Sequence, residues 1–236
     1  MNHSERSHDH LLFQFGKRGF DVVVAAVGLL LTLPLSVGVA LAIVIDDGRP
    51  ILHRGWRVGR DGRIFKIYKF RSMVAQLRQT GGVITTAGDR RVTPVGRFIR
   101  RTKLDELPQL FNVLRGDMSL VGPRPEHPNY VRLYTLEQRR VLSVRPGITG
   151  AASVRYPNEE QLLRGDDPEA LYRTVVMPEK LRIELEYLER RSFWGDLRLI
   201  AATALAVPRR ATPVELAVNG HAVSHPASAR TAPRSR

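Results

Sequence analysis

The sequence predicts a mostly helical α+β fold, in which one N-terminal membrane helix is attached to a small domain with a short β-hairpin. Three observations lead to this prediction. Residues 22–45 form an almost unbroken apolar run, two strand-like runs flank an Asp-Gly turn, and most later segments begin at a proline or show helical spacing of apolar residues. The 236 residues include no cysteine, so the fold cannot depend on disulfides, which fits the cytoplasm.

The chain is strongly basic, with a formal net charge of +14 and a sequence pI of about 11.0. This charge predicts anionic partners, which could be nucleic acids, anionic lipids or phosphate-rich substrates. The basic stretches lack interleaved aromatic residues and no helix-turn-helix pattern is persuasive, so we expect no nucleic-acid partner. The sequence also lacks a P-loop, a dinucleotide-binding glycine motif and the Cys/His spacing of a zinc site.

The apolar run at residues 22–45 contains no charged residue between Asp21 and Asp46. As a helix rising about 1.5 Å per residue it would be roughly 36 Å long, which is enough to cross a bilayer core of about 30 Å. A signal peptide has a shorter apolar run and a small-residue cleavage site, and neither is evident here. The sequence therefore predicts insertion into a membrane.

The topology of this segment depends on its flanks and on Pro34. Proline removes a helix hydrogen bond and clashes with the preceding turn, so we expect a kink. Both flanks are basic, and positive residues favour the cytoplasmic side. The basic positions before and after the run are Lys17, Arg18, Arg49, Arg54, Arg57, Arg60 and Arg63. These features leave two topologies open: a re-entrant helix that enters and leaves by one face, and a kinked single span.

A β-hairpin is predicted between residues 51 and 73, around the turn signal Asp61-Gly62. In its second run Phe65 and Ile67 alternate with Lys66 and Tyr68, so one face can be buried. Glycines at positions 81 and 82 then indicate a loop.

Several helices follow the hairpin. Prolines at helix starts predict helices over residues 95–101 and 109–114, the second ended by Arg115-Gly116. Apolar spacing predicts a further helix over residues 127–144. Pro178 opens a long amphipathic helix whose pattern resumes after Ser192 and continues to Ile200. We expect this part to pack on the domain or lie on the membrane surface, and we expect disorder after Pro208.

The strongest candidates for catalytic or binding residues lie between positions 97 and 125. Asp105 and Glu106 are adjacent carboxylates, cations precede them, and Arg124 is held between two prolines. An acid pair near fixed cations suits phosphoryl chemistry, which needs a nucleophile or metal ligand and positive charge for phosphate oxygens. The carboxylates could equally solvate a helix start, and the upstream arginines could face anionic lipid. The upstream arginines are Arg97, Arg100 and Arg101.

A set of motifs across residues 15–205 resembles the bacterial sugar transferase family, which comprises monotopic phosphoglycosyl transferases acting on polyprenol phosphate at the inner membrane. The matching motifs are Lys17-Arg18-x-x-Asp21, Val58-Gly59-Arg60-Asp61-Gly62, Tyr68-Lys69-Phe70-Arg71-Ser72-Met73, Leu104-Asp105-Glu106-Leu107-Pro108-Gln109-Leu110, Gly116-Asp117-Met118-Ser119-Leu120-Val121-Gly122-Pro123-Arg124-Pro125 and Arg145-Pro146-Gly147-Ile148-Thr149-Gly150. The absence of a long multi-span region before residue 15 leads us to expect the small catalytic form of the family.

The resemblance implies a reaction and its residues. Asp105 would attack a UDP-sugar and release UMP, and undecaprenyl phosphate would then displace the phosphosugar from Asp105. Glu106 would act as a base or as a metal ligand, and Mg²⁺, held by Asp105 and Glu106, would neutralise the diphosphate. Lys69, Arg100 and Arg124 would bind phosphate oxygens. The implied partners are the UDP-sugar, undecaprenyl phosphate and anionic inner-membrane lipid, and the sequence leaves open whether the protein forms a homodimer.

The resemblance also favours a re-entrant helix, broken at Pro34, below a catalytic domain on the cytoplasmic face of the bacterial inner membrane. The break departs from the family, because Leu33 stands where a serine is usual, although Thr32 and Ser36 lie nearby. The expected organisation is an N-terminal tail at 1–15, a membrane helix at 16–48, a catalytic domain at 49–207 and a tail at 208–236. The segment after Gly150 also departs from the family form, so the sugar is not assigned. A membrane-anchored basic interaction protein without catalysis is the alternative.

Overall fold

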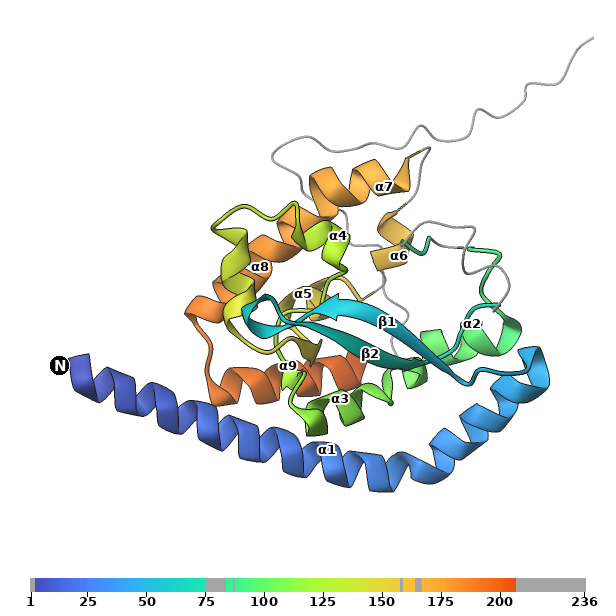
Figure 1. The fold of residues 1–236 in the computed structure, drawn as a ribbon, viewed down its shortest axis with the longest axis horizontal. Helices are drawn as coiled ribbons and strands as arrows, with labels where there is room; N and C mark the ends of the chain where they lie inside the picture. The colour runs from blue at the N-terminus through green and yellow to red at the C-terminus, as the bar shows by residue number, and fades with distance from the viewer. Residues whose placement is uncertain (1–2, 75–83, 87, 158, 164–166, 207–236) are drawn as a thin grey trace, which may run out of the picture.

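The computed structural model describes residues 3–74, 84–86, 88–157, 159–163 and 167–206. A long helix, α1 (His3–Asp47), runs beneath a domain in which short helices surround a β-hairpin (Figure 1). The mostly helical α+β fold is thus confirmed. The loop predicted at Gly81-Gly82 and the tail predicted after Pro208 lie outside the described residues.

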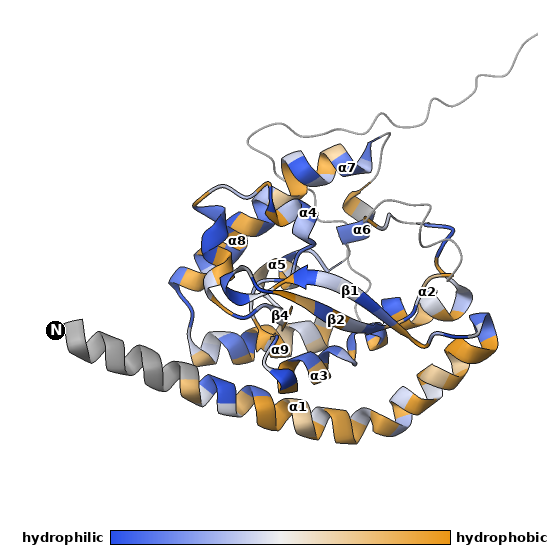
Figure 2. Cartoon of the chain, in the orientation of Figure 1, coloured by the Kyte–Doolittle hydropathy of each residue, from blue (hydrophilic) through white to orange (hydrophobic). Residues whose placement is uncertain are grey.

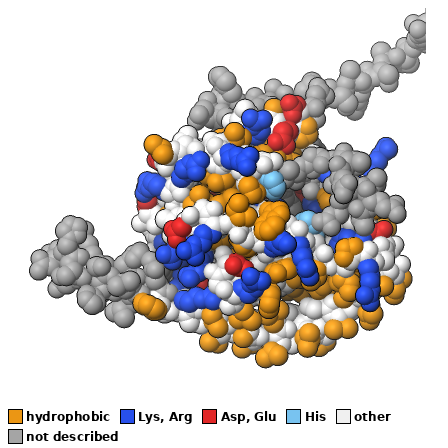
Figure 3. Space-filling model, in the orientation of Figure 1, with side chains coloured by type: hydrophobic (Ala, Val, Ile, Leu, Met, Phe, Trp, Pro, Cys, Tyr) orange, Lys and Arg blue, Asp and Glu red, His pale blue; other side chains and the backbone are white. Residues whose placement is uncertain are grey.

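Helix α1 is long and apolar enough, from Phe15 to Asp47, to cross a membrane. Pro34 lies inside it, and the ribbon bends so that both arms rise towards the domain (Figure 1). The hydroxyl of Thr32 donates to the carbonyl of Gly28, at 2.7 Å, within the turn before the proline. Most of the coloured part of this helix is hydrophobic (Figure 2). In the space-filling view, hydrophobic side chains lie along the lower edge of the molecule (Figure 3), and Leu31 is 76% exposed. A soluble protein rarely exposes such a continuous apolar surface, which indicates association with a membrane.

Polar contacts fix residues 17 and 18 of α1 to the domain. Arg18 donates to the carbonyls of Val113 and Leu114, in the last turn of helix α3 (Gln109–Arg115), where cations are favourable. Lys17 forms an ion pair of 2.6 Å with Asp196 in helix α9 (Phe193–Ala206). At the other end of α1, Arg71 donates to the carbonyls of residues 47 and 48. The helix is therefore anchored just before its long apolar run and again at its C-terminal end.

The predicted hairpin is confirmed. Strands β1 (Leu52–Val58) and β2 (Ile64–Phe70) pair antiparallel, from Leu52 opposite Phe70 to Val58 opposite Ile64. The turn between them contains the short helix η1 (Arg60–Gly62), in which Asp61 and Gly62 have φ values of 56° and 77°. These left-handed conformations explain the Asp-Gly signal. Phe65 and Ile67 are buried, as their alternation predicted.

A second sheet was not predicted from the sequence. Strands β3 (Ser119–Val121) and β4 (Gly147–Thr149) pair in parallel, with Ser119 opposite Gly147 and Val121 opposite Thr149. Each strand has only three residues, which is too short for a periodic signal. The pairing nevertheless brings together two of the motifs on which the resemblance depends.

The helices predicted from prolines are confirmed. Helix α2 (Pro94–Arg101) is capped by Thr93, whose side chain accepts a hydrogen bond from the Gly96 amide. Helix α3 ends at Gly116, with a φ of 88° that suits glycine.

The helix predicted over residues 127–144 is wrong. The chain forms helix α4 (Pro128–Val131) and a separate 3₁₀ segment η4 (Gln138–Ser143). Between them, the Thr135 amide donates to the Gln138 side chain and the Gln138 amide donates to the Thr135 hydroxyl. This reciprocal capping starts a new segment and competes with a continuous helix.

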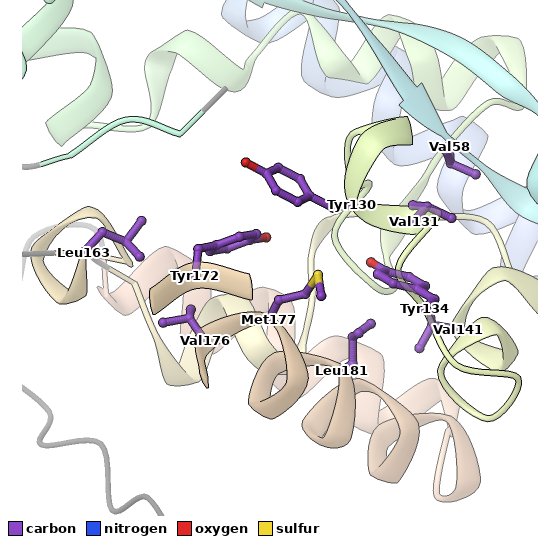
Figure 4. Packing of buried hydrophobic residues seen from close by; sticks show 10 residues of the cluster. All are labelled: Val58, Tyr130, Val131, Tyr134, Val141, Leu163, Tyr172, Val176, Met177 and Leu181. Atoms are coloured by element: carbon purple, nitrogen blue, oxygen red, sulfur yellow. The ribbon is translucent and has the colours of Figure 1, made fainter. Parts of the chain in front are cut away.

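The long helix predicted from Pro178 is divided in two. Helix α8 (Met177–Glu189) ends before Ser192, whose side chain accepts from the Gly195 amide in the first turn of α9. Four short segments precede α8: α5 (Ala151–Arg155), α6 (Glu159–Leu162), α7 (Pro168–Leu171) and η5 (Tyr172–Val176). Buried side chains from η5, α8 and the α4–η4 region pack together (Figure 4), and Leu181 of α8 belongs to this cluster.

Candidate active site

Three segments converge near the carboxylate pair. Lys69 lies near the end of β2, Asp105 and Glu106 lie in the 3₁₀ segment η3 (Leu104–Glu106), and Arg124 follows β3. The buried Asn112 of α3 fixes β2 beside them, because its Oδ1 accepts from the Tyr68 amide at 3.0 Å and its Nδ2 donates to the Lys66 carbonyl at 2.8 Å. Helix α3 thereby holds the strand that carries Lys69.

An unusual backbone turn directly precedes the two carboxylates. Lys103 lies between α2 and η3 and adopts a left-handed conformation, with a φ of 58°. A lysine at positive φ is uncommon, and such conformations concentrate at functional sites. Within η3, both Asp105 and Glu106 are largely removed from solvent.

Glu106 binds two cations through one oxygen. Its Oε1 accepts from Lys69 Nζ at 2.9 Å and from Arg124 Nη2 at 2.7 Å. Burial opposes ionisation of Glu106, but Arg124 and then Lys69 outweigh burial and hold the pKa of this carboxyl well below its usual range. Glu106 is therefore ionised at neutral pH, and it orients both cations.

Asp105 is buried, with a relative exposure of 7%. Its Oδ1 has no hydrogen-bond partner within the described part of the chain. Burial raises the pKa of Asp105, while the positive charge of Lys69 opposes this rise, as do Arg100 and Lys103 more weakly. A buried oxygen without a partner is costly and often marks a functional position. Asp105 is thus the carboxylate with capacity for a further interaction.

Arg100 lies apart from the group formed by Lys69, Glu106 and Arg124. Its Nη2 contacts Glu160 Oε2 in α6 at 2.7 Å. The structure therefore brings two of the three predicted phosphate-binding cations to Glu106, and it pairs the third with a different carboxylate.

Close packing of the second sheet sets the position of Arg124. The Gly122 amide donates to the Thr149 carbonyl at 3.0 Å. A Cβ atom at Gly122 would lie 2.5 Å from the Arg145 carbonyl oxygen, so a side chain would force the strands apart. The glycine before Pro123 is therefore required by packing, and the proline then fixes the backbone leading to Arg124.

A pocket beside Arg124 contains polar residues that the sequence analysis did not identify. These residues are Glu126, Lys180 and Glu184, with Tyr134 and Tyr172 in the same lining. Lys180 and Glu184 are four residues apart on α8, on the side of the helix that also carries the buried Leu181. A charged residue between the apolar positions of an amphipathic helix was the available sequence signal.

The carboxylate pair also bears on metal binding. Among the described residues, no group of three or more His, Cys, Asp or Glu side chains is close enough to hold a metal ion. Mg²⁺, however, is usually held by one or two protein carboxylates together with substrate phosphates. Asp105, with its unpartnered oxygen, and the adjacent Glu106 fit that kind of site.

Comparison with known proteins adds independent information. The family described as bacterial sugar transferase matches residues 12–210. The chain is 37% identical over 199 residues to a UDP-N-acetylgalactosamine-undecaprenyl-phosphate N-acetylgalactosaminephosphotransferase of Aeromonas hydrophila, covering 81% of this chain and 43% of the relative. It is 40% identical over 198 residues to an undecaprenyl-phosphate glucose phosphotransferase of Komagataeibacter xylinus, covering 79% of this chain and 35% of the relative.

A shorter relative is matched over more of its length. The chain is 42% identical over 193 residues to a UDP-glucose:undecaprenyl-phosphate glucose-1-phosphate transferase of Caulobacter vibrioides, covering 79% of this chain and 67% of the relative. Against the two relatives named before it, the chain spans less than half of their length.

Proposed function

The chain belongs to the bacterial sugar transferase family, and we propose that it transfers a phosphosugar from a UDP-sugar to undecaprenyl phosphate. The observation that carries this proposal is the buried Asp105 oxygen without a partner, next to Glu106 and its two bound cations. The printed names of the relatives support the sugar-phosphate transfer and its lipid acceptor. Such a transfer would begin the synthesis of an exopolysaccharide, an O-antigen or another glycan.

In the first step, an oxygen of Asp105 attacks the β-phosphorus of the UDP-sugar. A new bond forms between this oxygen and the phosphorus, and the bond from the phosphorus to the bridging oxygen breaks. UMP leaves with the electron pair of that bond, and the phosphosugar stays on Asp105. Burial supports this role, because an Asp105 carboxyl removed from water is poorly hydrated and has one oxygen without a partner among the described residues.

In the second step, a phosphate oxygen of undecaprenyl phosphate attacks the same phosphorus. The bond to Asp105 breaks, the carboxylate is restored, and undecaprenyl diphosphate-sugar leaves. Both steps transfer a phosphoryl group between oxygens, so the same cations can stabilise both transition states.

Glu106, Lys69 and Arg124 then act as a unit. Glu106 holds both cations beside Asp105, and the cations bind the phosphate oxygens as negative charge develops. Mg²⁺, held by Asp105 and Glu106 together with the diphosphate, would supply further charge neutralisation. Arg100 would join the phosphate-binding group after leaving Glu160.

The bend in α1 supports a re-entrant membrane topology, in which both basic flanks stay on the cytoplasmic face of the inner membrane. Lys and Arg side chains lie just above the apolar edge of the molecule (Figure 3), where they would meet anionic headgroups. In this orientation the lipid acceptor would reach Asp105 from the membrane while the UDP-sugar arrives from the cytoplasm.

The decisive experiment replaces Asp105 with Asn in the full chain and measures UMP release from a panel of UDP-sugars. The substitution should lower turnover by at least about 10³-fold and abolish the covalent phosphosugar adduct seen by mass spectrometry, because the nucleophile is lost. Asp61→Asn, in the exposed hairpin turn, is the matched control and should leave both unchanged. Normal turnover by Asp105→Asn would refute the nucleophile. Absence of UMP release by the unaltered protein from every UDP-sugar would instead favour a membrane-anchored interaction protein.

A further inference from the structure

Lys180 is a buried cation that the proposed reaction has not yet used. Its side chain is 12% exposed and its Nζ lies 2.7 Å from Oε2 of Glu159 in α6. The ammonium also lies 5.4 Å from the ring centre of Tyr172, a residue of the buried cluster in Figure 4. The Tyr172 hydroxyl in turn donates to Glu126. Lys180 is therefore held in one place before any substrate binds.

The place in which Lys180 is held is the pocket beside Arg124. Both side chains line this pocket, together with Glu126 and Glu184. Glu159 lies within the electrostatic range of both cations: burial opposes its ionisation, but Lys180 and then Arg124 lower the pKa of Glu159. Lys180 thus contacts Glu159 directly, and the charge of Arg124 also acts on this carboxylate.

The ion pairs of Lys69, Arg124, Arg100 and Lys180 divide into two kinds. Lys69 and Arg124 contact Glu106, which is fixed in η3 directly beside Asp105. Arg100 and Lys180 instead contact Glu160 and Glu159, which are neighbours in the four-residue helix α6. A UDP-sugar brings two negative charges on its diphosphate, and these charges can replace those of the two α6 glutamates.

We propose, on the basis of the function proposed above, that Lys180 binds a phosphate oxygen of the nucleotide donor. In the free protein Glu159 forms an ion pair with Lys180, and the donor phosphate replaces Glu159 when the donor binds. The pairing keeps the buried ammonium compensated in the free protein, since an unpaired buried charge would be costly. It also means that donor binding must break one ion pair, so the two partners should influence nucleotide affinity in opposite directions.

The test measures direct binding of UDP by calorimetry, using the full chain in lipid nanodiscs and the Asp105→Asn background to exclude turnover. Lys180→Gln should weaken UDP binding by about 10-fold or more, because a charge-assisted hydrogen bond is lost. Glu159→Gln should tighten UDP binding several-fold, because the competing carboxylate is gone. Lys180→Arg, which keeps the charge, should retain a substantial part of the affinity.

The matched controls are Arg182→Gln and Glu179→Gln, which remove an exposed ion pair of 2.7 Å on the same helix and should leave UDP binding unchanged. Weaker binding in both the Lys180 and Glu159 variants would show that their ion pair is only structural and would overturn the inference. Unchanged binding in the Lys180→Gln variant would also overturn it. Failure of the unaltered protein to release UMP from any UDP-sugar would instead refute the proposed function itself, so the two failures are distinguishable.

Discussion

Glu184 of α8 should make the stability of this protein fall as the pH rises towards neutrality. Its side chain is buried, with 4% relative exposure, and its Oε1 accepts from the Ala152 amide at 3.1 Å. Its Oε2 has no hydrogen-bond partner among the described residues. Burial raises the pKa of Glu184 to about 7, against the opposing effects of the Ala152 amide and Lys180. The charge of Glu184 in turn helps to raise the pKa of Tyr134, after burial and Glu126.

The size and sign of the effect follow from proton linkage. The ordinary pKa of a Glu carboxyl is 4.5, so the pKa of Glu184 is about 2.5 higher in the folded protein than in the unfolded chain. This difference corresponds to about 3 kcal/mol. Below pH 4.5 both the folded and the unfolded chain are protonated, and Glu184 contributes no penalty. Between pH 4.5 and 7 the unfolded chain ionises first, so stability is lost, and above pH 7 the full penalty applies.

Substitution of Glu184 by Gln removes this titration while preserving the shape of the side chain and its acceptor oxygen. The melting temperature, followed by tryptophan fluorescence in detergent at one scan rate, should match that of the parent near pH 4.5. By pH 8 the variant should melt higher by roughly 6–12 °C, since about 3 kcal/mol shifts a domain of this size by that amount. Glu186→Gln, on the exposed side of the same helix, should show no such trend. A difference between variant and parent that stays constant from pH 4.5 to pH 8 would refute the reasoning.

Two further predictions concern α1. Because the chain lacks cysteine, single cysteines introduced at Ser4 and Ser72 can report the topology of α1. A membrane-impermeant maleimide should label both cysteines from the same face of the membrane. Labelling from opposite faces would show that the helix spans the membrane. Lys17→Met leaves Asp196 and Asp21 buried without their cation and should lower the free energy of unfolding by about 3–5 kcal/mol, measured by thermal unfolding. Adding Asp196→Asn should recover part of this loss, and an unchanged melting temperature in the single variant would contradict the role of the pair.

The parts of the fold that the sequence predicted are those whose causes are local. Pro94 and Pro108 lie at helix starts because their missing amide is not needed there, and Gly116 ends α3 in a left-handed conformation. Asp61-Gly62 needs only its own backbone to form the hairpin turn. In each of these cases the nearest few residues contain the whole physical reason.

The wrong or missing structure predictions concern segments whose conformation depends on tertiary contacts or on competing local contacts. The apolar spacing over residues 127–144 is compatible with a helix, but Thr135 and Gln138 cap each other and divide the segment. Strands β3 and β4 exist because residues 119–121 and 147–149 meet across a distance in sequence that no short pattern records. The pairing of Lys180 with Glu159 likewise depends on a fold that places α8 beside α6.

The role of Glu106 likewise could not be predicted from its neighbours in the sequence. Adjacency in the sequence identified Asp105 and Glu106 together, but it left the role of Glu106 open between base and metal ligand. The two cations that decide this role come from positions 37 and 18 residues away, and both bind one oxygen of Glu106. A general base must take up a proton, and protonating Glu106 would leave Lys69 and Arg124 partly buried against a neutral group. The geometry therefore argues against Glu106 as a general base and indicates that it orients Lys69 and Arg124, a role that is compatible with the Mg²⁺ contact proposed above.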